Sequence, residues 1–362
     1  MLLGAGSASA LAADTPDGRP VVIVNKGNNS KIAGRDLVDG NDNTTGSGHT
    51  VTRTTPTPTP SPSPSPTPTT PAQLVAWYQT GTTTGDGTPY VSPAALAGHA
   101  SVVEIAAVHL NNPAQFPGMI LTLNNDLPSA PKYAPMWRDL DALKAKGVKA
   151  TALLGGEAGN TYQLLDSDFE MYYPPIRDFL RTYDLDGIDL DIEEPLFTEA
   201  TAEKLITQLR TDFGADFLIT LAPYAGMLQT PPGSNLPDID YPTLEANVGS
   251  SIDWYNAQFY CGDANLSTTS DYDQIIQNQF PASKVAAGAI TWAAPGCSGY
   301  VAMPTLQNTL RSLAAKYPGF RGAAGWEYAP STEVNASNCP TGPASWYCAV
   351  QQALPSTPTS TP

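Results

Sequence analysis

Short apolar runs recur along the chain between residues 72 and 354, with helix-like segments between them. The runs are rich in β-branched and aromatic residues, which is typical of buried strands. They span residues 74–78, 102–110, 148–154, 185–192, 217–221, 252–260, 285–290 and 320–328. We therefore expect eight strands in this part of the chain.

Between these runs, apolar residues return at the spacing of one helix face. The first stripe has members at i, i+4 and i+7 and ends before Gly147, a typical helix stop. The second follows Pro174 and Pro175, which we expect near a helix start. The three stripes are Met136, Leu140 and Leu143; Ile176, Phe179, Leu180 and Tyr183; and Leu205, Ile206, Leu209 and Phe213.

Strands that alternate with helices over roughly 250 residues are typical of an α/β fold, the (β/α)8 or TIM barrel. The alternative is a doubly wound open sheet. Eight evenly spaced units without a Gly-rich phosphate loop favour the closed barrel. The weak first and seventh runs leave the strand count open.

Composition divides the rest of the chain. Residues 54–71 alternate Pro with Thr or Ser, so we expect an extended, semi-rigid linker that cannot join a core. The polar segment 14–53 has too little apolar surface for a core of its own. We expect it to be disordered or to form a short strand that needs a partner. We expect residues 72–354 to form the barrel domain, and residues 355–362, which repeat the linker composition, to begin a second linker or tail.

Two features predict export. Residues 1–13 end in small residues that fit an A-x-A cleavage pattern, as in the remnant of a signal peptide; a flexible Ala-rich start is the alternative. The four cysteines lie in the last third of the chain and form no C-x-x-C pattern, which favours disulfides over zinc. Three pairings are possible. The short separation of Cys339 and Cys348 favours that pair, which leaves Cys261 for Cys297. We expect a secreted protein.

Charge narrows the range of partners. The chain has 34 acidic and 18 basic side chains, a formal net charge of −16. Phosphate binding needs clustered Lys and Arg side chains, which this acidic chain lacks, so we expect no nucleic-acid partner. No stretch is long and apolar enough to cross a bilayer, so we expect no membrane insertion. A neutral polysaccharide would not be repelled. We expect a monomer and predict no metal ligand and no cofactor.

The run at 185–192 leads into a ladder of acids. Alternate residues of a strand share a face, so Asp189, Asp191 and Glu193 point together into the barrel. Three carboxylates on one inner face repel one another and lose hydration, which raises the pKa of at least one. An acid that keeps its proton near neutral pH suits general acid catalysis. Glu193 comes last, at the C-terminal mouth where barrel enzymes have their active sites.

Two other interpretations of the ladder compete with the catalytic one. A calcium loop of the EF-hand type requires Asp or Asn where Ile188 stands. An exposed edge strand with its acids facing water fits the local pattern equally well. Paired acids seldom occupy a buried face without a function, which favours the catalytic interpretation.

Residues 186–193, Asp-Gly-Ile-Asp-Leu-Asp-Ile-Glu, resemble the signature of glycoside hydrolase family 18, the chitinases and endo-β-N-acetylglucosaminidases. Residues 153–156, Leu-Leu-Gly-Gly, are similar to the Ser-x-Gly-Gly of that family. Residues 258–260, Gln-Phe-Tyr, resemble its plant-type and fungal-type branch, and Trp326 is similar to the tryptophan beneath the cleaved sugar. The resemblance covers residues 72–354. Within the family, the chain is most similar in type to the secreted bacterial members. Leu153 and Cys261 depart from the plant-type pattern.

The resemblance implies that the acetamido oxygen of the substrate is the nucleophile. Glu193 would protonate the glycosidic oxygen and then activate water. Asp191 would orient the acetamido N–H and stabilise the oxazolinium charge, and Asp189 would share a proton with Asp191. Tyr260 would bind the acetamido carbonyl. The residues assigned to substrate binding are Gln258, Trp326 and Asp186.

The implied substrate is a polysaccharide or oligosaccharide that contains N-acetylglucosamine. Chitin or chitooligosaccharides are the first expectation, and the chitobiose core of N-glycans is the alternative. A lectin-like protein of the same fold is the alternative outside the enzymes, although Glu193, which lectin-like members replace, is present. Four strand-end aromatics could line sugar subsites, but such residues are more often packing residues, and we interpret His109 as a hydrogen-bonded structural residue. The four aromatics are Trp77, Tyr78, Tyr224 and Trp292.

Overall fold

The computed structural model describes residues 71–79, 90–157, 159–194, 197–232, 239–262, 264–294 and 297–355. The predicted signal-peptide remnant and polar segment lie outside these ranges. So do the linker and the C-terminal tail, apart from Pro71 and Pro355.

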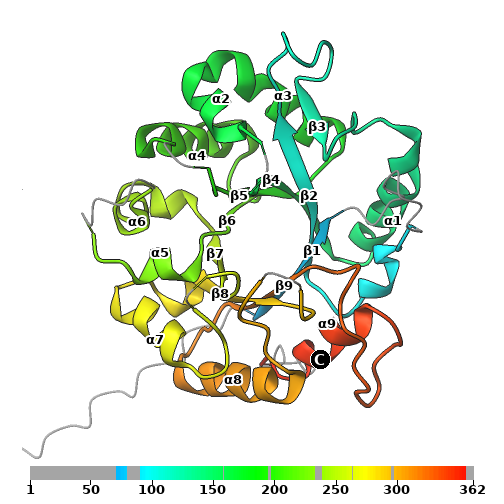
Figure 1. The fold of residues 1–362 in the computed structure, drawn as a ribbon, viewed down its shortest axis with the longest axis vertical. Coiled ribbons are helices and arrows are strands. Elements are labelled where there is room, and N and C mark those ends of the chain that lie inside the picture. Colours follow the sequence, from blue (N-terminus) through cyan, green and yellow to red (C-terminus); the bar gives the residue numbers. More distant parts are fainter. Residues whose placement is uncertain are drawn as a thin grey trace, which may run out of the picture. The chain divides into compact units, whose positions relative to one another are not determined.

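Eight parallel strands close into a barrel, which confirms the predicted (β/α)8 fold (Figure 1). The barrel closes because β1 pairs with both β2 and β9. Each predicted run overlaps one barrel strand. The strands are β1 (Gln73–Gln79), β2 (Val102–Leu110), β4 (Lys149–Gly155), β5 (Gly187–Asp191), β6 (Leu218–Leu221), β7 (Trp254–Gln258), β8 (Val285–Ile290) and β9 (Gly322–Trp326).

One further strand was not predicted from the sequence. The short strand β3 (Leu121–Leu123) pairs antiparallel with the C-terminal end of β2. Its three residues are too few to give a periodic signal. The hairpin extends β2 beyond the barrel, next to the mouth (Figure 1).

Helices surround the barrel (Figure 1). The three predicted stripes fall on α1, α3 and α4. Within the described residues, no helix is both long and apolar enough to span a membrane. The helices are α1 (Ala134–Lys144), α2 (Thr161–Ser167), α3 (Phe169–Thr182), α4 (Glu199–Phe213), α5 (Ala225–Gln229), α6 (Tyr241–Val248), α7 (Ser270–Gln277), α8 (Met303–Lys316) and α9 (Ala344–Gln351). Short 3-10 turns are η1 (Pro93–Leu96), η2 (Pro131–Tyr133), η3 (Gly249–Ser251) and η4 (Ala282–Lys284).

The predicted start of α3 was wrong. Pro174 and Pro175 lie inside the helix, which begins at Phe169. The side chain of Asp168 caps this end by accepting a hydrogen bond from the Met171 N–H at 3.1 Å. Such a cap satisfies one of the free N–H groups of the first turn, and it sets the helix start more strongly than the prolines do.

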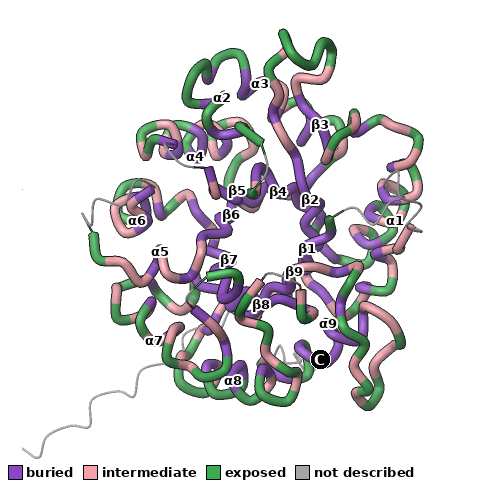
Figure 2. Tube along the Cα trace, in the orientation of Figure 1, coloured by how far each residue is buried: buried purple, intermediate pink, exposed green. Residues whose placement is uncertain are grey.

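The core has two layers, and buried residues line the strands while exposed residues lie on the outer helices (Figure 2). The outer layer packs the barrel against its helices and includes Ile188, Leu190 and Ile192. The inner layer fills the barrel and includes Trp77 and Leu153. The strand β5 therefore presents its apolar face to the helices, as the alternation predicted.

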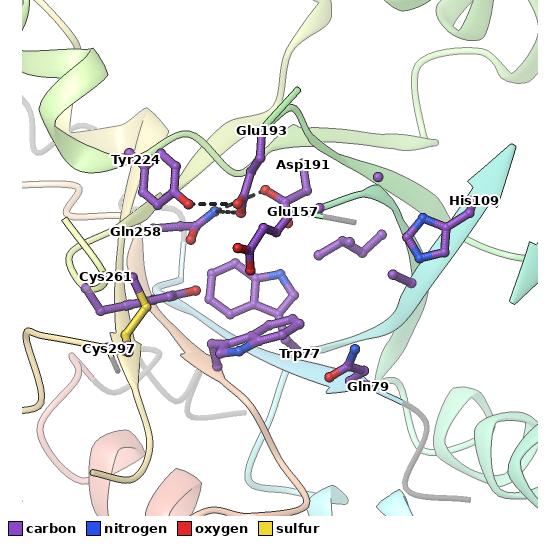
Figure 3. A pocket seen from close by; sticks show the side chains of 16 residues that line it. Trp77, Gln79, His109, Glu157, Asp191, Glu193, Tyr224, Gln258, Cys261 and Cys297 are labelled. Atoms are coloured by element: carbon purple, nitrogen blue, oxygen red, sulfur yellow. Dashed lines mark hydrogen bonds between the residues drawn. A yellow bond between two sulfur atoms is a disulfide. The ribbon is translucent and has the colours of Figure 1, made fainter. Parts of the chain in front are cut away.

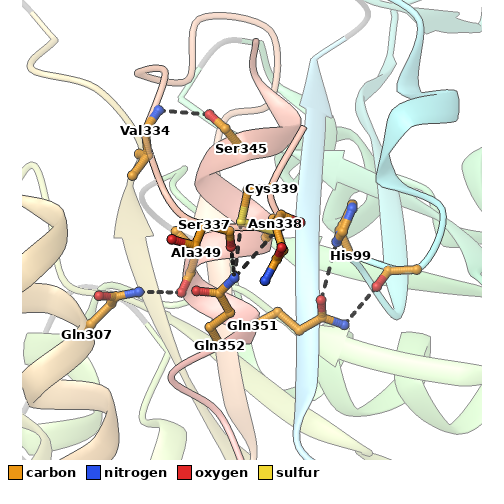
Figure 4. The surroundings of a disulfide bond; sticks show 12 residues. His99, Gln307, Val334, Ser337, Asn338, Cys339, Ser345, Ala349, Gln351 and Gln352 are labelled. Atoms are coloured by element: carbon orange, nitrogen blue, oxygen red, sulfur yellow. Dashed lines mark hydrogen bonds between the residues drawn. A yellow bond between two sulfur atoms is a disulfide. The ribbon is translucent and has the colours of Figure 1, made fainter. Parts of the chain in front are cut away.

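Both disulfides have the pairing that the cysteine spacing favoured. Cys339 and Cys348 join the loop before α9 to that helix, with 5.6 Å between their Cα atoms (Figure 4). Gln352 supports this loop by donating to the Ser337 carbonyl at 2.9 Å. Cys261 and Cys297 join the loops that follow β7 and β8. The second disulfide therefore lies at the mouth of the barrel.

Candidate active site

A cavity of about 540 Å³ opens at the C-terminal ends of the barrel strands (Figure 3). All strands of a parallel barrel end at the same mouth, so residues far apart in the sequence meet there. Several strand ends contribute a wall residue. These include Trp77, His109, Asp191, Gln258 and Trp326.

Glu193 lies in this cavity, two residues beyond the end of β5. The Tyr224 hydroxyl donates to Glu193 Oε2 at 2.7 Å. Gln258 Nε2 donates to Glu193 Oε1 at 3.2 Å and also to Asp191 Oδ1 at 3.0 Å. The two donors hold the Glu193 carboxyl in a fixed position, and Figure 3 shows Tyr224 and Gln258 pointing toward Glu193 and Asp191.

The backbone next to Glu193 is fixed as well. The carboxylate of Glu194 accepts hydrogen bonds from the N–H groups of Tyr162 and Gln163, each at 3.1 Å for the nearer oxygen. These N–H groups lie in the first turn of α2 and lack partners within the helix. The helix thus anchors the loop that carries the acid.

Asp191 is the buried member of the carboxyl cluster and is only 5% exposed. Burial raises the pKa of Asp191 well above its ordinary value, and the negative charges of Glu193 and Asp189 raise it further. The hydrogen bond from Gln258 opposes this rise without cancelling it. Asp191 therefore keeps its proton at pH values where an exposed aspartate is ionised.

Asp189 lies one step deeper in the barrel and does not line the cavity. The Thr220 hydroxyl donates to its Oδ1 at 2.6 Å, and Trp77 Nε1 donates to its Oδ2 at 3.2 Å. Burial raises the pKa of Asp189, whereas these two donors lower it. The two donors hold Asp189 rigidly beneath Asp191.

Aromatic side chains form another wall of the cavity. Trp77 meets Tyr260 and Trp326 edge to face, with ring centroids 6.4 and 6.1 Å apart. Burial, followed by the charges of Asp191 and Glu193, raises the pKa of the Tyr260 hydroxyl well above its ordinary value. Tyr260 therefore stays a hydrogen-bond donor. Tryptophan faces with nearby polar groups suit the apolar face and the hydroxyls of a sugar.

The structure brings together all but one of the predicted site residues. Glu193, Asp191, Tyr260, Gln258 and Trp326 line the cavity, and Asp189 lies beneath it.

The exception is Asp186, and its assignment to substrate binding was wrong. Its carboxylate accepts from the Ala150 N–H at 2.9 Å and pairs with Lys149 Nζ at 3.2 Å. Asp186 precedes β5, so it lies at the opposite end of the barrel, roughly 16 Å from Asp191 at about 3.3 Å of rise for each strand residue. It stabilises the barrel floor.

Three neighbours of the acids were not predicted from the sequence to be functional. Tyr224 and Trp77 were interpreted as packing residues, yet each donates a hydrogen bond to a carboxylate of the ladder. His109 was expected to be hydrogen-bonded, but its buried Nδ1 has no partner among the described residues, and the side chain lines the cavity. Burial lowers the pKa of His109, so the ring is neutral. The sequence held one signal for these residues: each lies at or near the C-terminal end of a predicted strand, where barrel enzymes have their active sites.

A barrel mouth with a fixed glutamic acid, a second carboxyl that keeps its proton and a wall of tryptophans defines the class of sugar-cleaving hydrolases. Comparison with known proteins agrees. The family model described as glycosyl hydrolases family 18 matches residues 97–295. The chain belongs to glycosyl hydrolase family 18, and its barrel is a chitinase-like glycoside hydrolase domain.

Individual relatives are similar over different lengths. Chitinase 2 of Rhizopus oligosporus is 30% identical over 208 residues, which cover 52% of this chain and 35% of that protein. The chain thus spans about a third of this curated relative. A fungal endo-β-N-acetylglucosaminidase of the family is 34% identical, with a TM-score of 0.68, over 78% of this chain and 98% of that one. A chitinase of Aspergillus fumigatus is 36% identical, with a TM-score of 0.67, over 74% and 95%.

Proposed function

We propose that this protein hydrolyses β-1,4 bonds next to N-acetylglucosamine in chitin or chitooligosaccharides, with retention of configuration and with the substrate's acetamide as nucleophile. The observation that carries the proposal is the pair formed by Glu193 and Asp191, joined through Gln258. Asp191 has a raised pKa and keeps its proton, and a protonated acid cannot attack a sugar. A nucleophile supplied by the substrate fits such a site, as in substrate-assisted glycosidases.

The proposed reaction has two steps. In the first, Glu193 gives its proton to the glycosidic oxygen while the acetamido oxygen attacks the anomeric carbon. The bond to the leaving sugar breaks, and an oxazolinium ion forms. In the second, the Glu193 carboxylate takes a proton from water, whose oxygen attacks the same carbon and reopens the ring. Two inversions at this carbon give net retention.

The other side chains support these steps. Asp191 would orient the acetamido N–H by accepting a hydrogen bond from it through a carboxyl oxygen. Tyr260 would donate a hydrogen bond to the acetamido oxygen, because its raised pKa keeps the hydroxyl protonated. Gln258 would line the same subsite, and Trp326 would stack beneath the ring. Asp189, fixed by Thr220 and Trp77, would tune Asp191 through its charge.

Endo-β-N-acetylglucosaminidase activity on N-glycan cores is the second candidate, favoured by a second cavity. This cavity, of about 500 Å³, shares His109 with the first and is lined mainly by side-chain amides. Amides and the half-exposed ring of Phe116 suit a neutral branched glycan. The amides belong to Asn111, Asn112, Gln115, Asn124, Asn125 and Asn160.

One experiment tests the activity and separates the two substrates. The protein is incubated in parallel with chitooligosaccharides, a high-mannose glycoprotein and cello-oligosaccharides, and the products are identified by mass spectrometry. We expect cleavage only of N-acetylated substrates. Cleavage of cello-oligosaccharides would contradict the role of the acetamide, and the β-anomer as first product, seen by NMR, would support retention.

The variant Glu193→Gln tests the acid. We expect it to fold normally and to lose hydrolysis of every substrate, because the amide has no proton to give to the leaving oxygen. Turnover by this variant at the wild-type rate would refute the mechanism. Sugar binding without any turnover by the wild type would support a lectin-like protein instead.

We also propose that the protein is exported. The two disulfides support this proposal, because disulfides persist in oxidising compartments. Cell fractionation with detection of the barrel domain tests it, and recovery in the cytosol with reduced cysteines would contradict it.

A further inference from the structure

A buried glutamate, Glu104, lies inside the barrel beneath the candidate active site. It belongs to β2, in register with Trp77 of β1, and is fully buried. Val102 and Ala106, which share its face of the strand, belong to the apolar cluster inside the barrel. Burying a carboxyl group in such surroundings costs free energy unless the group is neutral or well paired.

The contacts of Glu104 identify its partner. Asn256 Nδ2 donates to Glu104 Oε1 at 3.2 Å. Trp254 Nε1 donates to Asn256 Oδ1 at 2.7 Å, so the amide can only turn its NH2 group toward Glu104. Oε2 of Glu104 has no hydrogen-bond donor within the described ranges. Trp77, which lies beside Glu104 in the strand register, donates to Asp189 Oδ2, so the two carboxyl groups are neighbours, and the hydrogen bond between them acts to raise the pKa of Glu104 and to lower that of Asp189.

A hydrogen bond between two carboxyl groups requires a proton on one of them. Asp189 already accepts from Thr220 at 2.6 Å and from Trp77 at 3.2 Å, and both bonds favour its ionised form. Among the described residues, Glu104 accepts from Asn256 at 3.2 Å, and a hydrogen bond with Trp77 also favours its ionised form, but the two together do not outweigh its burial. Burial and the charge of Asp189 raise the pKa of Glu104 well above its ordinary value. The proton therefore resides on Glu104.

The charge on Asp189 acts further up the barrel. It raises the pKa of Asp191, which lies two residues along the same strand face. It also contributes to the raised pKa of the Tyr260 and Tyr162 hydroxyls. Leu153, beside Asp189 in the register of β4 and β5, has no hydroxyl that could hold this aspartate.

We propose that Glu104 is a positioning residue of the active site: it donates a hydrogen bond to Asp189, keeps Asp189 anionic and thereby keeps the proton on Asp191. This inference rests on the proposed function, because the state of Asp191 matters to turnover only if the barrel cleaves N-acetylated sugars. Four carboxyl groups, from Glu104 through Asp189 and Asp191 to Glu193, then form one chain from the barrel interior to its mouth.

Two matched variants test the donor role. Glu104→Gln keeps a neutral N–H donor in the same shape, whereas Glu104→Met has a similar volume and no donor. A lost charge-assisted hydrogen bond corresponds to roughly tenfold or more in rate. We expect kcat on a chitooligosaccharide to fall by about this factor in the Met variant, with KM little changed, and to recover largely in the Gln variant. Equal losses in both variants would overturn the proposal.

A second readout needs no activity. Because burial raises the pKa of Glu104, its contribution to stability is present at low pH and is lost as the pH rises through its folded pKa. Glu104→Gln cannot lose this proton. The Tm of the variant minus that of the wild type should therefore increase with pH. A difference that stays flat would overturn the proposal, even if Glu104→Met fails to fold.

The control variant is Glu170→Gln, which replaces an exposed glutamate that pairs with Lys204. We expect no increase with pH in the Tm difference between this variant and the wild type. If the wild type cleaves none of the substrates, the proposed function fails. The Tm difference of Glu104→Gln then still reports whether the buried pair holds its proton as described.

Discussion

Tyr224 offers the cleanest test of how the acid is held. The variant Tyr224→Phe removes one hydroxyl and keeps the ring, so Glu193 Oε2 loses a donor at 2.7 Å. A hydrogen bond to a charged group is worth about 1.5–3 kcal/mol, which corresponds to about 10- to 150-fold in rate. Tyr224 is only partly buried, so water can replace part of the lost bond. We therefore expect a loss near the lower limit, about tenfold in kcat/KM.

The assay is the initial rate on a chitooligosaccharide, measured beside a matched control. Tyr173→Phe removes the same kind of bond, a phenol donating to Asp212 Oδ2 at 2.5 Å, on the outer helices α3 and α4. It should cost stability, because Tyr173 is buried, and leave kcat/KM within about twofold, because neither Tyr173 nor Asp212 lines the cavity. Wild-type kcat/KM in Tyr224→Phe would refute the idea that this hydroxyl positions the acid. Equal losses in both variants would point to a general effect on folding.

Two further predictions concern buried groups near the mouth. Burial raises the pKa of Glu327 to about 7, and its Oε2 has no hydrogen-bond partner among the described residues. The stability that the protonated form contributes is lost as the pH rises through 7, by up to about 3 kcal/mol. Glu327→Gln should thus unfold at increasingly higher temperatures than the wild type from pH 5 to pH 8, as measured by circular dichroism; a constant difference would contradict the assignment. Trp77→Phe leaves a cavity and removes a donor from Asp189, so the free energy of unfolding in urea should fall by about 2–4 kcal/mol, and an unchanged midpoint would show that neither effect matters.

Local alternation determined much of the fold from the sequence alone. Eight apolar runs with helical stripes between them predicted the strands, because each strand buries two faces and each helix only one, and their even spacing favoured the closed barrel over an open sheet. The same period of two gave the inward direction of Asp189 and Asp191. The spacing of the cysteines favoured the correct disulfide pairs.

The sequence could not determine which residues hold the acids. Tyr224, Trp77 and Glu104 come from three other strands or their ends, and they reach the acids of β5 only because the barrel closes. A motif also does not reveal where its strand begins. Asp186 belongs to the signature, yet it lies at the barrel floor because β5 starts after it and carries the chain upward from there. Periodicity is a property of neighbours along the chain, whereas hydrogen bonding and proton affinity depend on neighbours in space, which only the tertiary structure brings together.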